Sequence, residues 1–372
     1  MTPGEGAGAG PVIDGSVLVI GTGLIGTSVA LALRRADVDV LLSDVAPENL
    51  RIALESGAGR LAADDDEPAI VVVAVPPRHA AHVIADASRR FPRATLTDVT
   101  SVKARVLREA LALGCDPARL VGGHPMAGRE VSGAAGARAD LLDDRLWVVT
   151  PLDTSEVAHL RQVHRLVSMC GAYPVEMSPA DHDSAVALVS HTPQVLASVL
   201  AGRLIDADPD HVRIAGQGLR DMTRIAASNV DMWSDILTVN AGPVADVIDG
   251  IVAELEATVL ALRRVAGAAG DPGSSPLVAD VLTAGVEGQR RIPGKHGAAP
   301  SAYREVTVVL ADKPGELGRL FSVVGEASVN LEDIRIEHVL GRPSGLVALF
   351  VKPEAGDRLV AALQGRDFGV RF

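Results

Sequence analysis

The sequence predicts an α/β protein of three parts: a doubly wound domain over residues 12–151, a mainly helical domain with a linker over 152–297, and a small βαββαβ domain over 303–372. Three observations predict it. Short β-branched runs alternate with helical stretches in the first part, segments with helical spacing fill the second, and strand-like runs return in the third. A chain of 372 residues that is 48% hydrophobic is long enough for two or three ordinary cores.

The first part opens as a βαβ unit. The run VLVI at 17–20 is followed by a Gly-rich turn, the helical stretch at 24–36 and a second apolar run that ends at Asp44. Further strands are predicted from AIVVVAV at 69–75, ATLTDV at 94–99 and LWVVTP at 146–151. Helical stretches between parallel strands predict a parallel, doubly wound sheet.

After Pro151 the strand-like runs give out, and Ala-, Leu- and Val-rich segments with helical spacing continue to about Val265. The turn-rich stretches 267–276 and 290–301 predict a linker region. The basic run within the second stretch, 290–296, could close over an anionic substrate, but a solvated linker is favoured because short charge runs usually lie on the surface.

The last part has the βαββαβ order of a ferredoxin-like module, with its first strand at 305–312 and its first helix at 314–327. In that helix Leu317, Leu320, Phe321 and Val324 follow at i, i+3, i+4 and i+7. This spacing predicts one apolar face that packs on the sheet.

Composition restricts the partners. A formal net charge of −12 and a pI near 5.3 argue against a nucleic acid or an anionic membrane surface as partner. The only two cysteines, Cys115 and Cys170, form no CxxC motif, which favours a reducing cytoplasm. Residues 1–11 have no signal-peptide pattern and predict a disordered tail, and the apolar run 69–75 is far shorter than the roughly 18 residues of a membrane span. Small molecules are therefore the expected partners.

A dinucleotide site is predicted at the first turn, where Gly21, Thr22, Gly23, Leu24, Ile25 and Gly26 form a GxGxxG motif between a strand and a helix. The glycines permit the tight turn and the approach of a pyrophosphate to the helix N-terminus. Asp44, about twenty residues on, is placed to accept hydrogen bonds from ribose hydroxyls and to repel a 2′-phosphate. NAD is therefore favoured over NADP, although Arg51 lies near enough in sequence to leave NADP open.

Two further motifs, at 98–103 and 122–130, are predicted to follow strands, where doubly wound sheets bind ligands. The second contains His124 between glycines and a proline. A histidine titrates near neutral pH and can accept a proton from an alcohol as hydride leaves for NAD. From the residues alone, catalysis and a structural loop role are equally favoured for His124.

The motifs GTGLIGTSVA, DVTSVK, GGHPMAGRE, DHDSAVALVSHTPQVLA and GLRDMTRIAASNVDMW resemble, in order, those of the prephenate/arogenate dehydrogenase family. The resemblance covers roughly residues 17–297, and DKPGELGRLF with VNLEDI resembles an ACT domain, as fused in one branch of the family. It implies a helical domain that dimerises the chain and NAD-dependent oxidative decarboxylation of prephenate to 4-hydroxyphenylpyruvate in tyrosine biosynthesis. The alternative is arogenate dehydrogenase, which gives tyrosine directly.

The resemblance also implies roles for individual residues. His124 matches the catalytic base, Ser101 matches a serine that hydrogen-bonds to the substrate hydroxyl and to the histidine, and Arg224 matches an arginine that holds a substrate carboxylate. The remaining matches are Glu130 and Asp221 of an ionic network and Trp233 of the pocket lining.

Two positions depart from the family's usual pattern. Thr100 stands where a glycine is common, which changes the backbone freedom beside Ser101. Gln194 replaces the second histidine of an SHLPH-type motif, so the preference between the keto group of prephenate and the ammonium group of arogenate stays open. His191 of the same motif is either a substrate-site residue or a buried core histidine. His182, between Asp181 and Asp183, is expected to be a solvated cap and not a metal ligand, because adjacent helix positions diverge.

In the ACT-like module the resemblance implies an amino-acid effector, with tyrosine expected, bound near Asp312, Gly315, Leu317 and Asn330. The alternative is a purely structural dimerising module. Two other functions were weighed. A 3-hydroxyacid dehydrogenase would need a catalytic lysine that the stretch 151–265 does not contain, and a non-catalytic NAD and amino-acid sensor is disfavoured by His124.

Overall fold

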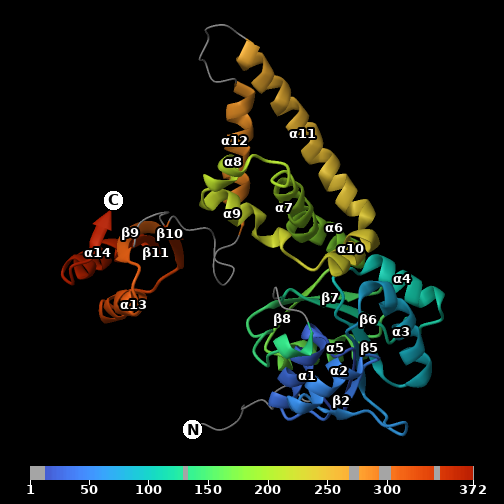
Figure 1. The fold of residues 1–372 in the computed structure, drawn as a ribbon. Helices are drawn as coiled ribbons and strands as arrows, with labels where there is room; N and C mark the ends of the chain where they lie inside the picture. The colour runs from blue at the N-terminus through green and yellow to red at the C-terminus, as the bar shows by residue number, and fades with distance from the viewer. Residues whose placement is uncertain (1–12, 129–132, 268–275, 293–302, 339–343, 372) are drawn as a thin grey trace, which may run out of the picture. The chain divides into compact units, whose positions relative to one another are not determined.

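The computed structural model describes residues 13–128, 133–267, 276–292, 303–338 and 344–371 and divides the chain into two compact units, Met1–Val252 and Ala253–Phe372. The expected N-terminal tail, Glu130 and most of the predicted linker lie outside the described residues. The first unit contains a strand-rich part and a helical part (Figure 1).

A five-stranded parallel sheet forms the centre of the strand-rich part. Its spatial order is β3 (Arg60–Leu61), β2 (Val40–Ser43), β1 (Val17–Ile20), β4 (Ile70–Val73) and β5 (Thr95–Asp98). The helices that connect its strands are α1 (Leu24–Arg35), α2 (Pro47–Glu55) and α3 (Pro77–Arg90), and α4 (Ala104–Ala112) follows β5. The predicted βαβ opening and the predicted strands at 69–75 and 94–99 are thus confirmed.

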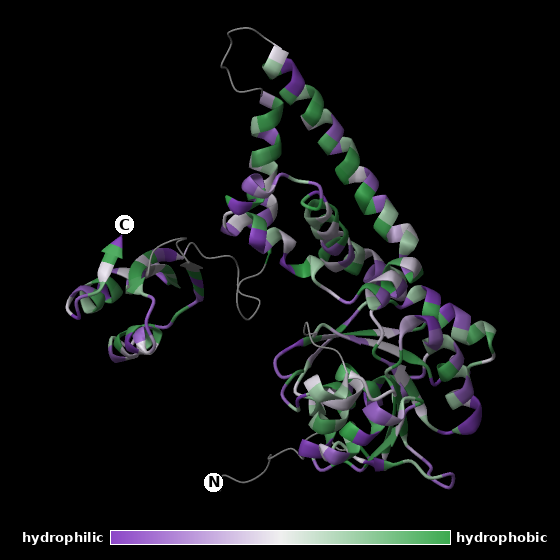
Figure 2. Ribbon diagram, viewed as in Figure 1, coloured by the Kyte–Doolittle hydropathy of each residue, from purple (hydrophilic) through white to green (hydrophobic). Residues whose placement is uncertain are grey.

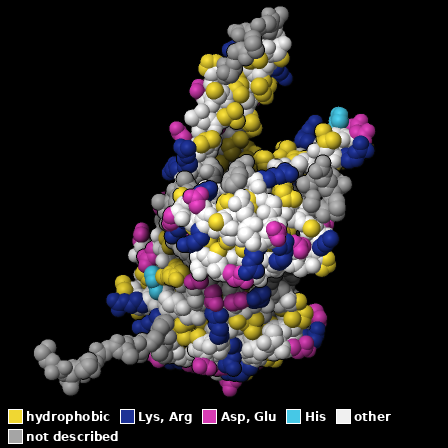
Figure 3. All heavy atoms as spheres, turned by 90° about the vertical axis from the view of Figure 1, so that its left-hand side faces the viewer, with side chains coloured by type: hydrophobic (Ala, Val, Ile, Leu, Met, Phe, Trp, Pro, Cys, Tyr) yellow, Lys and Arg dark blue, Asp and Glu magenta, His cyan; other side chains and the backbone are white. Residues whose placement is uncertain are grey.

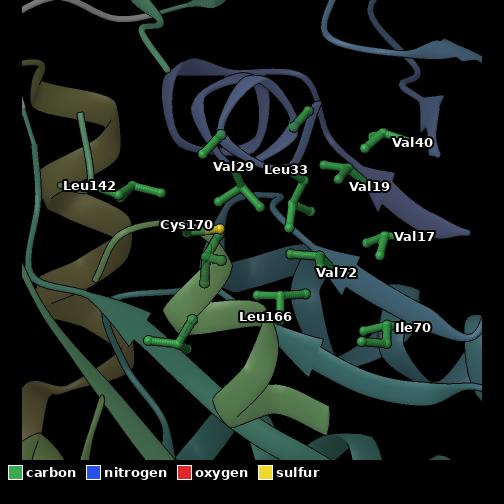
Figure 4. Packing of buried hydrophobic residues seen from close by; sticks show 14 of the residues in the cluster. Val17, Val19, Val29, Leu33, Val40, Ile70, Val72, Leu142, Leu166 and Cys170 are labelled. Carbon is green, nitrogen blue, oxygen red and sulfur yellow. The ribbon is translucent and has the colours of Figure 1, made fainter. Parts of the chain in front are cut away.

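Both faces of this sheet are covered because alternate strand residues point to opposite sides. Val17, Val19 and Val72 pack against α1 and α5 (Val157–Met169), as Figure 4 shows, whereas Leu18 and Val71 pack against α3 and α4. Each fully buried valine or leucine contributes about 1.5–3 kcal/mol relative to an exposed one. This two-sided burial is the reason that the strands have continuous apolar sequences.

The predicted strand at 146–151 does not join the parallel sheet. It forms β7 (Leu146–Pro151) in a three-stranded sheet, antiparallel to β6 (Val121–Pro125) and parallel to β8 (Tyr173–Glu176). Where residues 126–145 are described, their only helical element is the short η1 (Ala134–Gly136), so no crossover helix makes β7 parallel to β6.

Strand β8 corrects the expectation that strands end at Pro151. The sequence YPVE of β8 has no apolar run because the strand lies at the edge of its sheet with most side chains exposed. The strand-rich part therefore extends to Glu176, beyond the boundary at residue 151 that the sequence predicted.

Helices dominate the chain from Pro179, as predicted. They are α6 (Pro179–Val186), the π-helix η2 (Ala187–His191), α7 (Thr192–Gly202), α8 (Pro209–Arg213), α9 (Gln217–Thr223), η3 (Arg224–Ala226), α10 (Val230–Val239), α11 (Ala241–Gly267) and α12 (Pro276–Gln289). The continuous helical stretch Pro179–Gly202 is, by length and composition alone, apolar enough to cross a membrane, and 33% of its most apolar window is buried in the chain. The sequence analysis found no such stretch.

Many apolar side chains on these helices face solvent. Figure 2 marks apolar positions along the ribbons of α11 and α12, and the space-filling view of Figure 3 shows apolar side chains on the surface of the protruding helices. On these two helices they are Val252, Leu255, Val259, Leu260, Leu262, Val265, Leu277, Val281, Leu282 and Val286. Single exposed apolar residues are ordinary, but an extended set on neighbouring helical turns is typical of an interaction surface.

The end of the second unit has the predicted βαββαβ order: β9 (Arg304–Ala311), α13 (Glu316–Glu326), β10 (Asp333–His338), β11 (Ser344–Val351), α14 (Gly356–Gln364) and β12 (Gly369–Arg371), with the short η5 (Pro353–Ala355) before α14. The sheet order is β10-β11-β9-β12, with every neighbour antiparallel.

The apolar face predicted for the first helix of this module is only half right. Leu320 and Val324 are buried as expected, but Leu317 and Phe321 are 38% and 41% exposed, and Val323 is buried instead. Helical spacing identifies an apolar stripe, whereas the packing on the sheet decides which flank of the stripe is covered.

Candidate active site

The Gly-rich turn at 21–26 joins β1 to α1. Gly21 has φ +100°, and a Cβ on Gly26 would lie 2.0 Å from the Gly21 carbonyl oxygen, so both positions require glycine. Gly23 is the N-cap of α1, and a Cβ built there would meet no atom within 4 Å. The helix N-terminus therefore opens onto free space of the kind in which phosphates bind.

Asp44, at the end of β2, is fixed beside this turn. Its carboxylate accepts hydrogen bonds from the Thr22 hydroxyl at 2.8 Å and from the Ala46 amide at 2.7 Å. Arg51 makes ion pairs with Glu48 and Glu55 on its own helix α2. These pairs engage Arg51 within α2, while a carboxylate occupies the turn, which favours NAD over NADP.

The motif at 98–103 forms a tightly bonded turn after β5. The Asp98 carboxylate accepts hydrogen bonds from the Thr100 amide at 3.0 Å, from the Thr100 hydroxyl and from the Lys103 ammonium. The Thr100 hydroxyl also donates to the Val102 carbonyl at 2.9 Å. Since Thr100 has no positive φ, threonine fits this backbone where glycine is common in the family, and its hydroxyl closes the turn.

Lys103 is completely buried, although the sequence analysis assigned it no role. Besides its ion pair with Asp98, its ammonium donates to the Gly123 carbonyl at 2.7 Å, which links β5 to β6. Burial lowers the pKa of Lys103, and the Asp98 charge opposes this effect. A Cβ on Gly123 would lie 2.7 Å from the Asp98 carbonyl oxygen, so the strands approach this closely only with glycine at this position.

The sequence predicted that His124 lies in a loop after a strand. In the structure it lies within strand β6 instead. The strand was missed because two glycines and a proline interrupt its apolar pattern. The imidazole Nδ1 is 2.8 Å from His182 Nε2, and no hydrogen bond between described residues occupies Nε2. Burial is the main cause that holds the pKa of His124 well below 6.5, and the nearby His182, Lys103 and His191 lower this pKa further. The ring is therefore neutral near pH 7.

His182 corrects a second expectation, because it is fully buried and is not a solvated cap. Its Nδ1 lies 2.8 Å from Asp183 Oδ1, on α6. The cap of α6 is Ser178, whose hydroxyl accepts the Asp181 amide hydrogen. Among the residues described, no group of three or more His, Cys, Asp or Glu side chains could hold a metal ion.

Ser101 is half-buried next to this turn. In the described part of the chain no hydrogen bond joins its hydroxyl to His124, whose Nδ1 is engaged by His182. The structure therefore brings Ser101 to the site without forming the serine–histidine hydrogen bond that the resemblance implied.

His191 is the last residue of the π-helix, and its ring is buried, with 1% exposed. Burial alone is compatible with both a core histidine and a substrate-site residue. Its Nδ1 is 3.0 Å from Asn240 Nδ2, which also donates to the Asp183 carbonyl at 2.9 Å. The ring makes an edge contact with Trp233 at 6.1 Å between centroids. Burial lowers the pKa of His191 to about 4. Because π-helical turns often occur at functional sites, this placement supports the substrate-site alternative.

The other expected substrate residues lie on neighbouring helices. Gln194 is 5% exposed, and its amide lies 3.4 Å from the Ser198 hydroxyl within α7. Asp221 and Arg224 are exposed; Asp221 accepts a hydrogen bond from Gln217, and Arg224 begins η3, which packs on α7. Glu130 lies outside the described residues.

In the C-terminal module the four expected effector residues are all exposed. Asp312 and Gly315, the latter at φ +91°, lie in the turn before α13, where Leu317 follows. Asn330 lies after α13, and its amide donates to Glu332 at 3.2 Å. All four are accessible from solvent.

The fold and the site thus combine a Rossmann-like sheet, a glycine turn open at a helix N-terminus and a half-buried neutral histidine, which together are typical of a nucleotide-dependent dehydrogenase. Two family models match: "prephenate dehydrogenase, nucleotide-binding domain" over residues 29–176 and "prephenate dehydrogenase, dimerization domain" over 178–267. The chain belongs to the prephenate dehydrogenase family.

Individual relatives agree with this assignment. The probable prephenate dehydrogenase NovF of Streptomyces niveus is 36% identical, over 94% of this chain and 98% of that protein. The prephenate dehydrogenase of Bacillus subtilis is 28% identical, over 86% and 88% of the two chains. The crystal structure of A. aeolicus prephenate dehydrogenase in complex with hydroxyphenyl propionate and NAD+ superposes with a TM-score of 0.66 at 28% identity, over 75% of this chain and 98% of that one.

Proposed function

We propose that this chain is an NAD-dependent oxidoreductase that converts prephenate to 4-hydroxyphenylpyruvate, CO2 and NADH in tyrosine biosynthesis. The single observation that carries the proposal is the neutral His124, with Nδ1 engaged by His182 and Nε2 open as a proton acceptor. Family membership and the relatives' substrates support prephenate as the substrate.

The turn at 21–26 fits NAD. The open position at Gly23 leaves room for a pyrophosphate at the N-terminus of α1, and Asp44 lies where ribose hydroxyls would donate. NAD bound there supplies a hydride acceptor. The chain's own contribution is the placement of the substrate hydroxyl beside a base.

In this reaction His124 Nε2 takes the proton of the ring C4 hydroxyl as the C4 hydride leaves, and Ser101 hydrogen-bonds to the same oxygen. Arg224 holds a substrate carboxylate through its guanidinium fork. The oxidised ring is a vinylogous β-keto acid, so its ring carboxylate leaves as CO2 and the bonding electrons complete an aromatic ring. The resulting phenolate recovers the proton from His124. Asp221, Glu130, Trp233, His191 and Gln194 complete the proposed pocket.

The C-terminal module is proposed to be an ACT domain of ferredoxin-like fold that binds an amino acid, with tyrosine as the expected inhibitor. The βαββαβ order and the accessible Asp312, Gly315, Leu317 and Asn330 support this assignment. The exposed apolar residues of α11 and α12 and the match to a dimerization domain support a homodimer formed through the helices. The enzyme would act in the cytoplasm.

The test is NADH formation with NAD and either prephenate or arogenate, each with and without tyrosine. A rate on prephenate supports the proposal, and a rate on arogenate alone would assign the alternative substrate. Suppression by tyrosine would assign the ACT module. No rate on either substrate, together with retained NAD binding, would favour a non-catalytic sensor.

A further inference from the structure

Two buried polar side chains, His182 and Asp183, lead away from the candidate base His124. His124 Nδ1 lies 2.8 Å from His182 Nε2, and His182 Nδ1 lies 2.8 Å from Asp183 Oδ1. His182 is fully buried and Asp183 is 4% exposed, so water has little access to either hydrogen bond. The family assignment accounts for His124 but leaves His182 and Asp183 without a role.

The carboxylate of Asp183 is held in place from a third segment of the chain. Its Oδ1 accepts the Lys103 amide hydrogen at 2.7 Å, and its Oδ2 accepts the Ala104 amide hydrogen at 2.9 Å. These two amides belong to the start of α4, next to Ser101. Both carboxylate oxygens of Asp183 are therefore held by backbone amides, which orients Oδ1 towards His182.

The hydrogen-bond directions follow from this anchor. An ionised carboxylate only accepts, so His182 Nδ1 carries a hydrogen and donates it to Asp183. The Nε2 of a neutral His182 then accepts from His124, and His124 carries its hydrogen on Nδ1. Its Nε2 keeps a lone pair, which a general base needs. A doubly protonated His182 would reverse the bond and leave His124 with a hydrogen on Nε2, unable to act as a base.

We propose that His182 and Asp183 are positioning residues that fix the catalytic tautomer of His124 and stabilise the imidazolium formed when His124 accepts the substrate proton. The proposal rests on the proposed function for its catalytic consequence, but not for the tautomer. The proton taken from the substrate is held on His124 Nε2 until the phenolate recovers it, while His124 Nδ1 continues to donate its hydrogen to His182. Asp183 acts through His182 and touches no reacting atom.

The test compares three full-length variants with the unaltered enzyme. His182→Gln places an amide oxygen where it can accept from His124 Nδ1, His182→Leu removes the acceptor, and His211→Gln changes an exposed histidine as a control. Long-range 15N–1H NMR of histidine-labelled protein reports the His124 tautomer, and a fourth variant, His124→Asn, identifies the His124 signals by their loss. NADH formation gives kcat, KM and their pH dependence.

The expected results are an Nδ1–H tautomer in the unaltered protein, in His182→Gln and in the control, and a predominantly Nε2–H tautomer in His182→Leu. The kcat of His182→Leu should fall roughly 100-fold, on the scale of general-base catalysis, with KM for NAD unchanged, and His182→Gln should recover most of that loss. An Nε2–H tautomer in the unaltered protein, or an equal loss of kcat in both variants, would overturn the proposal. If His182→Leu does not fold, the tautomers of the unaltered protein and of His182→Gln still decide. If the unaltered protein shows the expected Nδ1–H tautomer but is inactive on both prephenate and arogenate, the positioning role is retained and only the proposed function is refuted.

Discussion

The two halves of the candidate active site are built in different ways. The proton-transfer half, made of Asp98, Lys103, His124, His182 and Asp183, is buried apart from partial exposure of His124, and each polar group is hydrogen-bonded inside the chain. The carboxylate half, made of Asp221, Arg224 and Trp233, lies on or next to short helices whose polar side chains are exposed. The first group is held by hydrogen bonds within the chain, whereas the second is open to solvent. We therefore predict that substitutions in the first group act on the chemical step and substitutions in the second group on substrate binding.

The largest effect is expected from the proton-transfer half. His124→Asn removes the base, so kcat should fall by on the order of 10³-fold, while NAD affinity stays unchanged because the glycine turn is separate. Steady-state kinetics and NAD titration measure both quantities, with the exposed His211→Asn as the control. A loss of less than tenfold would mean that another group takes the proton.

The carboxylate half should respond in KM. Arg224→Gln removes a charged hydrogen-bonding fork, which is worth about 1.5–3 kcal/mol, so KM for prephenate should rise roughly 10- to 100-fold with a smaller change in kcat. Arg220→Gln, an exposed arginine on the preceding helix α9, is the matched control. If KM is unchanged and kcat falls, Arg224 acts on the chemical step and not on substrate binding. The predicted difference between the two halves would then be wrong.

The pH dependence of kcat/KM sharpens the comparison. The pKa of His124 is lowered by burial and by His182, Lys103 and His191, so the neutral base persists below pH 6.5. The rate should stay level from pH 8 to 6.5 and fall only at lower pH, as His124 becomes protonated. A fall with its midpoint at 6.5 or higher would show that the base is not shielded in this way.

The smallest effect is expected on stability. The pKa of His191 is about 4 in the folded chain, against an ordinary value near 6.5 when unfolded. Between these values the unfolded chain binds a proton that the folded chain does not, so stability is lost as the pH falls from 6.5 towards 4. The melting temperature should therefore decrease between pH 7 and pH 5, and by a few degrees less in His191→Gln. Equal decreases in His191→Gln and the unaltered protein would refute this assignment, and His211→Gln, at an exposed position, is the control substitution.

Sequence patterns predicted the first sheet and the glycine turn because strongly apolar strands and a GxGxxG motif are local signals. They missed β8 and the strand that carries His124, because an edge strand and a glycine-rich strand lack apolar runs. They also placed His182 in solvent. The divergence of adjacent helix positions argued only against a metal, whereas Asp183 accepts hydrogen bonds from the amides of Lys103 and Ala104, about 80 residues earlier in the chain. Contacts of such sequence separation leave no periodicity to detect.

Lys103 connects the strand-rich part of the first unit to its helical part. Its ammonium bonds to residues 98 and 123, and its amide bonds to Asp183 in the helical part of the same unit. A fragment that ends before α6 would keep the nucleotide turn but lose His182 and Asp183, which we propose orient the base. An attempt to transplant this chemistry onto another dinucleotide fold must carry α6 with it.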